Sequence, residues 1–313
     1  MKKFLSTLAL AAMVSSPAAA DTLRWMTGSP GGSFYPLGGA LKGFLEEERP
    51  DLKLEVVNGG GIANIKGVGT NKAVLGFANS VTTVDALNGA EPFGTPHTDV
   101  CNVAALYPQY FQMVVLKDSE IKSPADFKGI SLASQKAGTT GEQFARLVLG
   151  VNGLSYDDLG RLNQVGYNDA VSMMKDGNAD AFTLVTTAPA GAVMDLAAAR
   201  DIRMLPVADA TYETLKQNMP GLQLGAIPGG TYQGVDEDTA ALTWSAHIIT
   251  RCDAPDDLIY TLTRNVLEHA EALGGVASAA KGLDLERMSQ DLGVPFHPAA
   301  AKFYAENGIE VAK

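Results

Sequence analysis

The sequence contains few of the residues that most often carry catalysis or bind metal ions. Its 313 residues include only four histidines and two cysteines, and the histidines do not stand at the short spacings typical of metal ligands. No Gly-x-Ser-x-Gly nucleophile motif, His-Glu-x-x-His zinc motif or Walker phosphate loop is present. These absences argue against an enzyme and against a bound metal or cofactor.

The cysteines, Cys101 and Cys252, allow two interpretations. An even pair in an oxidising compartment favours a disulfide. Two buried thiols are the alternative, and the sequence favours neither. Two cysteines without partnering histidines do not make a metal site.

Long apolar runs are absent except at the N-terminus. Lys2 and Lys3 precede the apolar stretch Phe4–Val14, and Ala18–Ala20 forms a small-residue cleavage site. This pattern predicts a secretory signal peptide over residues 1–20, cleaved after Ala20. The run is too short to span a bilayer. We therefore expect a soluble, exported mature chain that does not insert into a membrane.

Basic residues are the minority. Without the leader the chain carries 22 basic and 35 acidic residues, a net charge of −13, and has no basic cluster. This balance argues against nucleic acid as a partner. An anionic small molecule remains compatible with it, because helix N-termini act locally on a bound anion.

A glycine-rich loop, Thr27–Gly32, follows a short strand-like run, Leu23–Met26. An amphipathic helix is then predicted from Pro36, with leucines and a phenylalanine on one face. Free N–H groups at a helix N-terminus after such a loop form a generic anion site. The chain repeats this arrangement at Gly138–Arg146, where Thr139 or Thr140 begins a capping box. We expect the two helix ends to face one small anion.

Strands and helices alternate along the chain. After the strand Leu23–Met26 and the helix from Pro36 come the strand Leu52–Val57, a helix over Ile62–Gly69, a buried strand ending at Asn79 and a helix over Val81–Leu87. The order of these six elements is β-α-β-α-β-α. This order predicts a parallel sheet with helices on its faces. Two apolar runs around Tyr107–Phe111 are expected to pass from one lobe to another.

Polar, uncharged residues follow four of the predicted strands: Ser33 to Tyr35, Asn79 with Ser80, Thr139 with Thr140, and Thr186 with Thr187. Ligands of α/β sheets bind beyond the carboxyl ends of strands. We expect these residues to bind a carboxylate, with Tyr107 as a wall and Lys136 facing a second carboxylate. Each also has a structural interpretation, as a helix cap, a strand end, a core tyrosine or a solvated lysine.

The sequence resembles the TAXI proteins, the extracytoplasmic solute receptors of tripartite ATP-independent (TRAP) transporters. The similarity covers nearly the whole mature chain. It rests on Thr27–Gly38, Asn58–Asn64, Leu75–Ser80, Ala105–Phe111, Asp118–Gly129, Asp180–Phe182, Ala188–Pro189, Gly230–Tyr232 and His297–Pro298. Departures at Gly61, Asn79 and Gly138–Gly141 fall in the expected cleft and leave the exact ligand open.

This resemblance implies an α/β, two-lobed, periplasmic-binding-protein-like (type II) fold, each lobe a mostly parallel sheet flanked by helices. We expect lobe I over residues 21–107 and 246–313, lobe II over 108–245, and a hinge near 107–110 and 240–246. The expected ligand-binding residues are Gly32, Ser33, Phe34, Tyr35, Asn58, Asn64, Asn79, Ser80, Tyr107, Lys136, Thr139, Thr140, Thr186 and Thr187.

The resemblance further implies a monomeric periplasmic receptor that delivers a glutamate-like amino acid, dicarboxylate or 2-oxoacid to TRAP membrane subunits. The expected protein has no catalytic residue, metal or cofactor. Two alternatives stay open: a substrate-binding protein of an ATP-driven (ABC) importer, and an exported enzyme on the same scaffold.

Overall fold

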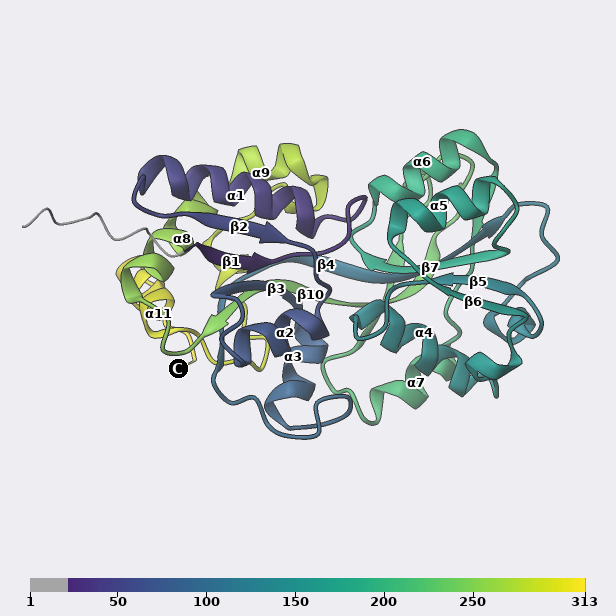
Figure 1. Ribbon diagram of the computed structural model, residues 1–313, viewed down its shortest axis with the longest axis horizontal. Coiled ribbons are helices and arrows are strands. Elements are labelled where there is room, and N and C mark those ends of the chain that lie inside the picture. The colour runs from purple at the N-terminus through teal and green to yellow at the C-terminus, as the bar shows by residue number, and fades with distance from the viewer. Residues whose placement is uncertain (1–21, 313) are drawn as a thin grey trace, which may run out of the picture.

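The computed structural model describes residues 22–312, so the expected signal peptide lies outside the described residues. Two lobes lie side by side along the long axis (Figure 1). The first contains, in chain order, β1 (Leu23–Met26), α1 (Phe34–Glu48), β2 (Leu54–Val57), α2 (Ile62–Gly69), β3 (Leu75–Asn79) and α3 (Ser80–Leu87). The β-α-β-α-β-α order expected for this part is present.

The chain then enters the second lobe through β4 (Val100–Leu116) and returns through β10 (Thr239–Arg251). Between them lie β5 (Ser131–Ser134), α4 (Thr140–Val151), β6 (Arg161–Gln164), α5 (Tyr167–Lys175), β7 (Ala181–Thr186), α6 (Gly191–Ala199), β8 (Ile202–Met204), α7 (Asp209–Lys216) and β9 (Gln223–Ile227), with short 3₁₀ turns at Pro124–Phe127 and Tyr156–Asp158. The C-terminal part packs on the first lobe as α8 (Asp256–Glu268), α9 (Ala270–Val276), a 3₁₀ turn at Ser278–Ala280, α10 (Leu285–Met288) and α11 (Pro298–Glu306).

The strands form one sheet in the order β2-β1-β3-β10-β4-β7-β5-β6. β1 pairs in parallel with β2 and β3, and β5 pairs in parallel with β6 and β7. Every antiparallel pair involves β4 or β10, which pair with each other, β4 also with β7 and β8, and β10 also with β3 and β9. Helices cover both faces of each parallel part, so the expected α/β fold is confirmed.

Each lobe has its own apolar core. In the first lobe, Trp25, Phe77 and Tyr304 are fully buried in one cluster with the inner faces of α1, α8 and α11. In the second lobe, separate clusters form around Phe144 and Phe182 on the two faces of the sheet. Separate cores let the lobes behave as two packed bodies.

β4 is one continuous strand of 17 residues, although the sequence suggested two apolar runs around Tyr107–Phe111. Pro108 lies within it, opposite Ser245, next to a register irregularity between Ser245 and His247. An irregular register tolerates a proline, because the missing N–H costs no regular ladder hydrogen bond. β3 pairs with the end of β10 at Ala246–Thr250, and β7 pairs with β4 from Tyr110 onward. The expected lobe boundaries fall inside these two strands and stay a prediction.

The amphipathic pattern of Pro255–Leu273 predicts a single capped helix, but the structure has two helices there. α8 ends at Glu268, and α9 begins at Ala270. His269 between them stacks on Phe44 of α1, with ring centroids 3.8 Å apart. This contact with the first lobe lies at the break between α8 and α9, and the periodicity of the sequence alone does not predict that break.

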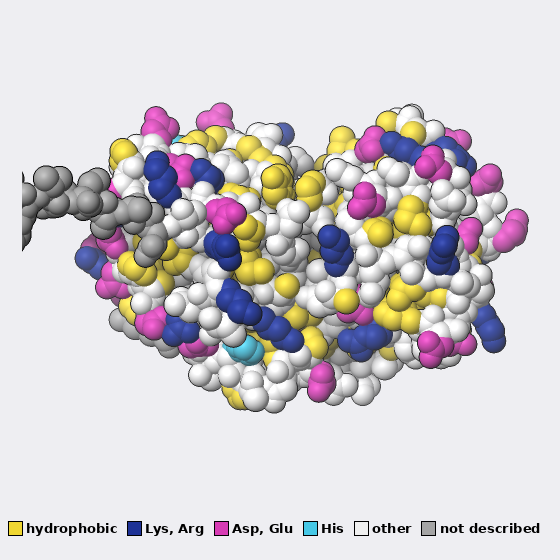
Figure 2. Space-filling view, viewed as in Figure 1, with side chains coloured by type: hydrophobic (Ala, Val, Ile, Leu, Met, Phe, Trp, Pro, Cys, Tyr) yellow, Lys and Arg dark blue, Asp and Glu magenta, His cyan; other side chains and the backbone are white. Residues whose placement is uncertain are grey.

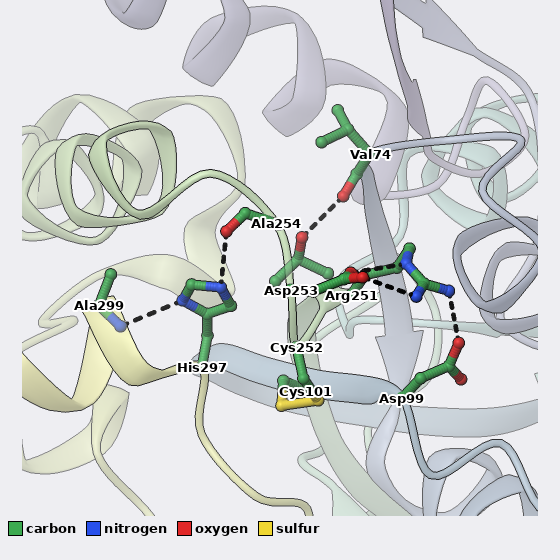
Figure 3. Close-up of a disulfide and its surroundings, with 10 residues drawn as sticks. Val74, Asp99, Cys101, Arg251, Cys252, Asp253, Ala254, His297 and Ala299 are labelled. Carbon is green, nitrogen blue, oxygen red and sulfur yellow. Dashed lines mark hydrogen bonds and ion pairs between the residues drawn. A yellow bond between two sulfur atoms is a disulfide. The ribbon is translucent and has the colours of Figure 1, made fainter.

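Cys101 and Cys252 form a disulfide, which resolves the open choice from the sequence. It joins the start of β4 to the residue after β10, across 151 residues of chain (Figure 3). Beside it, Arg251 pairs with Asp99 and Asp253, and His297 caps α11 by accepting from the Ala299 amide. The disulfide therefore ties both crossing strands together at their outer ends in the first lobe.

A chain lacking this crosslink should be less stable, because the disulfide closes a long loop in the unfolded state. We expect the Cys101→Ser, Cys252→Ser double variant to lose about 3–5 kcal/mol of unfolding free energy. Urea denaturation of oxidised wild type, reduced wild type and the variant measures this. The variant should match reduced wild type, and a midpoint equal to that of the oxidised protein would contradict the stabilising role.

Candidate functional site

A small enclosed cavity of about 20 Å³ lies between the two lobes, and we call it the interlobe cavity. It is lined by loops at the carboxyl ends of β1, β2, β3, β5 and β7. Five helices begin at this cavity, through Phe34 of α1, Gly61 before α2, Asn79 before α3, Thr140 of α4 and Tyr167 of α5. The first glycine loop and the Gly138 loop thus meet at one place, as the sequence predicted.

The side chains that line the interlobe cavity carry no formal charge; they belong to Ser, Phe, Asn, Gln, Thr, Tyr, Val and Gly residues. Figure 2 shows charged side chains of both signs spread over both lobes, with basic side chains also near the junction between the lobes on this face. The backbone N–H groups of Thr140 and Gly141 donate no hydrogen bond within the described chain. Free amides and aligned helix dipoles make the cavity favourable for an anion.

The lobes contact each other directly at the cavity wall. A Cβ on Gly60 would lie 2.6 Å from Cγ2 of Thr139, and one on Gly61 would lie 2.0 Å from Oγ1 of Thr140. Gly61 also has a φ of +45°, which favours glycine. Only glycines at these two positions permit the backbone of the first lobe to approach α4 this closely.

Asn79 connects three parts of the structure. Its Nδ2 donates to Oγ1 of Thr140 at 3.1 Å, and its Oδ1 accepts from Nε1 of Trp244 on β10 at 2.7 Å. Oγ1 of Thr82 lies 3.4 Å from the Thr140 hydroxyl. Asn79 and Thr140 are both buried, so this interlobe contact is shielded from water.

Ser33 and Thr186 make the second polar contact between the lobes. The Ser33 amide donates to Oγ1 of Thr186 at 3.2 Å, and the Ser33 hydroxyl accepts from Nε2 of Gln109 at 3.3 Å. Ser33 makes no side-chain cap for α1, so the capping interpretation does not account for it. Gly32 lies beside this contact, with space limited by the Tyr167 ring and Thr186.

Asn64 and Thr139 have their polar groups engaged in local structure. The Asn64 Nδ2 donates to the carbonyls of Met26, Thr27 and Phe77, and its Oδ1 accepts from the Gly60 amide. The Thr139 hydroxyl caps α4 by accepting from the Glu142 amide and donates to the Lys136 carbonyl. Asn64 positions three strand ends, and Thr139 positions the start of α4.

Asn58 and Lys136 line a wider opening of about 450 Å³, which we call the mouth. Asp169 at the start of α5 and Tyr167 share this opening. Thr139 belongs to both the mouth and the interlobe cavity, so the two spaces adjoin. The mouth therefore places one cationic and one anionic side chain next to the neutral cavity.

The remaining expected residues lie elsewhere. Tyr35 is 40% exposed on the outer side of α1. Ser80 and Tyr107 line a groove of about 680 Å³ that also involves Trp244 of β10. Thr187 lines a separate groove of about 320 Å³, together with Gly32 and Ser33 and residues of α6 and α9. The structure does not bring these four residues into the interlobe cavity.

Gln135 and Tyr167 line the interlobe cavity but were not among the expected residues. Nε2 of Gln135 donates to the Tyr167 hydroxyl at 2.7 Å, and that hydroxyl donates to the Val185 carbonyl at 2.6 Å. Burial raises the pKa of the Tyr167 phenol, as it does that of Tyr107, so both rings stay neutral. Their positions in the chain could have identified them as cavity residues, since Gln135 directly follows β5 and Tyr167 begins α5.

Among residues 22–312, no group of three or more His, Cys, Asp and Glu side chains gathers as a metal site. In the same part of the chain, no helix has the length and apolar character needed to cross a membrane.

Comparison with known proteins places the chain in a family. The model of the NMT1-like family matches residues 26–308. A protein from Bordetella bronchiseptica RB50 is 19% identical with a TM-score of 0.54, covering 91% of this chain and 88% of that one. A protein described as a periplasmic transporter is 14% identical with a TM-score of 0.52, covering 91% and 92%. The periplasmic aliphatic sulphonate binding protein SsuA from Escherichia coli is 15% identical with a TM-score of 0.44, covering 91% and 78%.

Substitution of Gly60 tests the contact between the lobes. A Gly60→Ala side chain would overlap Thr139, whose hydroxyl is held by two hydrogen bonds and resists rotation. We expect the variant to be more open, with a larger radius of gyration by small-angle X-ray scattering. Gly43→Ala on α1, where a Cβ meets nothing within 4 Å, is the matched control. Identical scattering from Gly60→Ala and wild type would show that the lobes do not close on this contact in solution.

Proposed function

The chain belongs to the NMT1-like family, and from this premise we propose that it is a periplasmic solute-binding protein that holds a small carboxylate between its lobes. The observation that carries the proposal is the convergence of five helix N-termini on one uncharged cavity. The expected signal peptide supports export, and the two-lobed fold supports binding by closure.

The chemistry of the cavity favours a carboxylate held by neutral donors. Each neutral hydrogen bond contributes ~0.5–1.5 kcal/mol, and each helix dipole ~0.3–1 kcal/mol. Micromolar binding requires about −8 kcal/mol. Four or five such donors together with helix dipoles reach this range without a cationic side chain in the cavity.

The mouth supports a second recognition element. Lys136 there suits a second carboxylate, and Asp169 suits an ammonium group on the same ligand. This pairing favours glutamate-like amino acids, with dicarboxylates and 2-oxoacids as ligands that use Lys136 alone. We therefore propose Thr140, Gly141, Asn79 and Gln135 as cavity ligands and Lys136 as the outer contact.

Ligand entry requires the lobes to separate. A cavity of about 20 Å³ accommodates roughly one water molecule, which is smaller than any carboxylate. Because β4 and β10 are the strands that cross between the lobes, we propose bending near residues 107–110 and 240–246. Lobe I then comprises residues 21–107 and 246–313, and lobe II residues 108–245.

We propose binding without turnover. The lining of the interlobe cavity offers no general acid, general base or activated nucleophile, since its polar side chains are hydroxyls and amides. The enzyme alternative needs such a pair at the same place.

We propose TRAP membrane subunits as the partner, on the resemblance to TAXI receptors. An ABC importer is the alternative, and the two differ in their energy source. Uptake of the solute into membrane vesicles of the expressing cells, with purified protein added, separates them. A TRAP partner requires uptake that stops when a sodium ionophore collapses the gradient, whereas dependence on ATP with no effect of the ionophore would identify an ABC importer.

Isothermal titration calorimetry with glutamate, dicarboxylates and 2-oxoacids should show saturable binding with a micromolar Kd. Thr140→Val keeps the side-chain shape but leaves the Asn79 amide without its acceptor in the closed form. We expect affinity to fall at least tenfold, with an unchanged circular dichroism spectrum.

Thr214→Val on the exposed side of α7 is the control and should bind like wild type. Wild-type affinity in Thr140→Val would exclude the start of α4 from the site. Turnover of any tested carboxylate would contradict a pure binding role.

A further inference from the structure

A second cavity between the lobes, of about 220 Å³, lies apart from the interlobe cavity and the mouth. We call it the lower cavity, because α3 and α7, which contribute to it, lie along the lower edge of Figure 1. Asp85 of α3 and Glu91 come from the first lobe, and Gln143, Arg146 and Asn218 come from the second. The solute site described above uses none of these residues.

Asp85 is a buried carboxylate without a counter-charge. It is 7% exposed, and the described residues provide its carboxylate with neither a hydrogen bond nor an ion pair. A carboxylate removed from water is costly unless a positive or hydrogen-bonding partner faces it. Asp85 therefore has no protein partner among the described residues, and its carboxylate is left to water or an ion in the lower cavity.

Gln143 presents a second oxygen of the same kind from the other lobe. The residue is 4% exposed, and its Oε1 has no hydrogen-bond partner among the described residues. Its Nε2 points to the Glu91 carbonyl at 3.5 Å, which places the amide beside the first lobe. Unsatisfied buried acceptors call for a specific explanation, such as a bound ion.

We propose that the lower cavity binds a hard divalent cation, with Ca²⁺ as the fitting ion, through Asp85 and Gln143 Oε1. Glu91 and Asn218 line the same cavity, and their side-chain oxygens with water can complete an all-oxygen ligand set. Carboxylate, amide and water oxygens are the ligands that Ca²⁺ takes. Two carboxylates make a weak site, with a Kd of roughly 10⁻⁴–10⁻³ M, the range of extracellular Ca²⁺ modules.

The cation bridges the lobes, because its ligands come from α3 and the following loop on one side and from α4 and the loop after α7 on the other. Binding to oxygens that meet only on closure stabilises the closed arrangement. The proposed cation site uses these residues whatever the solute is, so cation binding is measured without solute.

An ion pair with Arg146 is the alternative way to neutralise the Asp85 carboxylate. Its guanidinium lines the same cavity, and its side chain is 51% exposed and pairs with Glu142 at 3.6 Å. If Arg146 instead turns toward Asp85 in solution, no cation is needed. A like charge near a cation site lowers cation affinity, so removing Arg146 has opposite effects under the two explanations.

The first experiment measures thermal unfolding with and without 10 mM CaCl₂, against NaCl at the same ionic strength. We expect Ca²⁺ to raise the Tm of wild type by about 2–4 °C. Asp85→Asn should lose this response, and Asp118→Asn, an exposed carboxylate on another surface, should keep it. No Ca²⁺-specific shift in wild type, or the same shift in Asp85→Asn, would overturn the proposal.

The second experiment titrates Ca²⁺ by calorimetry into wild type, Gln143→Leu and Arg146→Gln. We expect Gln143→Leu to bind at least fivefold more weakly and Arg146→Gln at least twofold more tightly. If Arg146→Gln loses thermal stability and binds no Ca²⁺, Asp85 forms an ion pair with Arg146, and the cation site is rejected. Solute binding in the absence of Ca²⁺ remains a separate measurement, so the two proposals fail independently.

Discussion

The antiparallel pairing of β4 with β10 is the constraint on which the rest of the structure depends. These two strands belong to both lobes, and the Cys101–Cys252 disulfide fastens their outer ends in the first lobe. Every other strand pairs on one side or the other of this central pair. The lobes thus share one sheet, and the main apolar clusters lie to either side of this central pair.

The pairing also fixes where the helices begin. Parallel strands on both sides of the central pair direct their carboxyl ends toward the same interlobe space, and the helices that follow them start there. In our proposal, the positive ends of their dipoles and their free amides take the place of lysine or arginine in holding the anion. A neutral lining also avoids strong charge repulsion on the lobe closure that we propose.

The polar residues at this space serve two purposes. Asn79 with Thr140, and Ser33 with Thr186, hold the lobes together in the structure, and in our proposal some of the same groups bind solute. Binding and closure then draw on one set of hydrogen bonds, because a buried amide or hydroxyl must find a partner in either state. The lower cavity differs, since the Asp85 carboxylate and Oε1 of Gln143 have no hydrogen-bond partner among the described residues.

The sequence by itself determined the α/β class, the first six elements and the meeting of the two glycine loops, because apolar periodicity and the direction of parallel strands are local properties. It also selected Asn79, Thr139 and Thr140, which lie at the end of β3 and at the start of α4. Only the tertiary structure decided that Gln135 and Tyr167 line the cavity. It also decided that the polar groups of Asn64 and Thr139 form hydrogen bonds with the backbone. Four expected residues lie outside the cavity: Tyr35, Ser80, Tyr107 and Thr187. The disulfide was likewise undecided until β4 and β10 were paired. The physical reason is that strand ends are set by neighbours in sequence, whereas the direction of a side chain and its hydrogen-bond partner are set by residues distant in the chain.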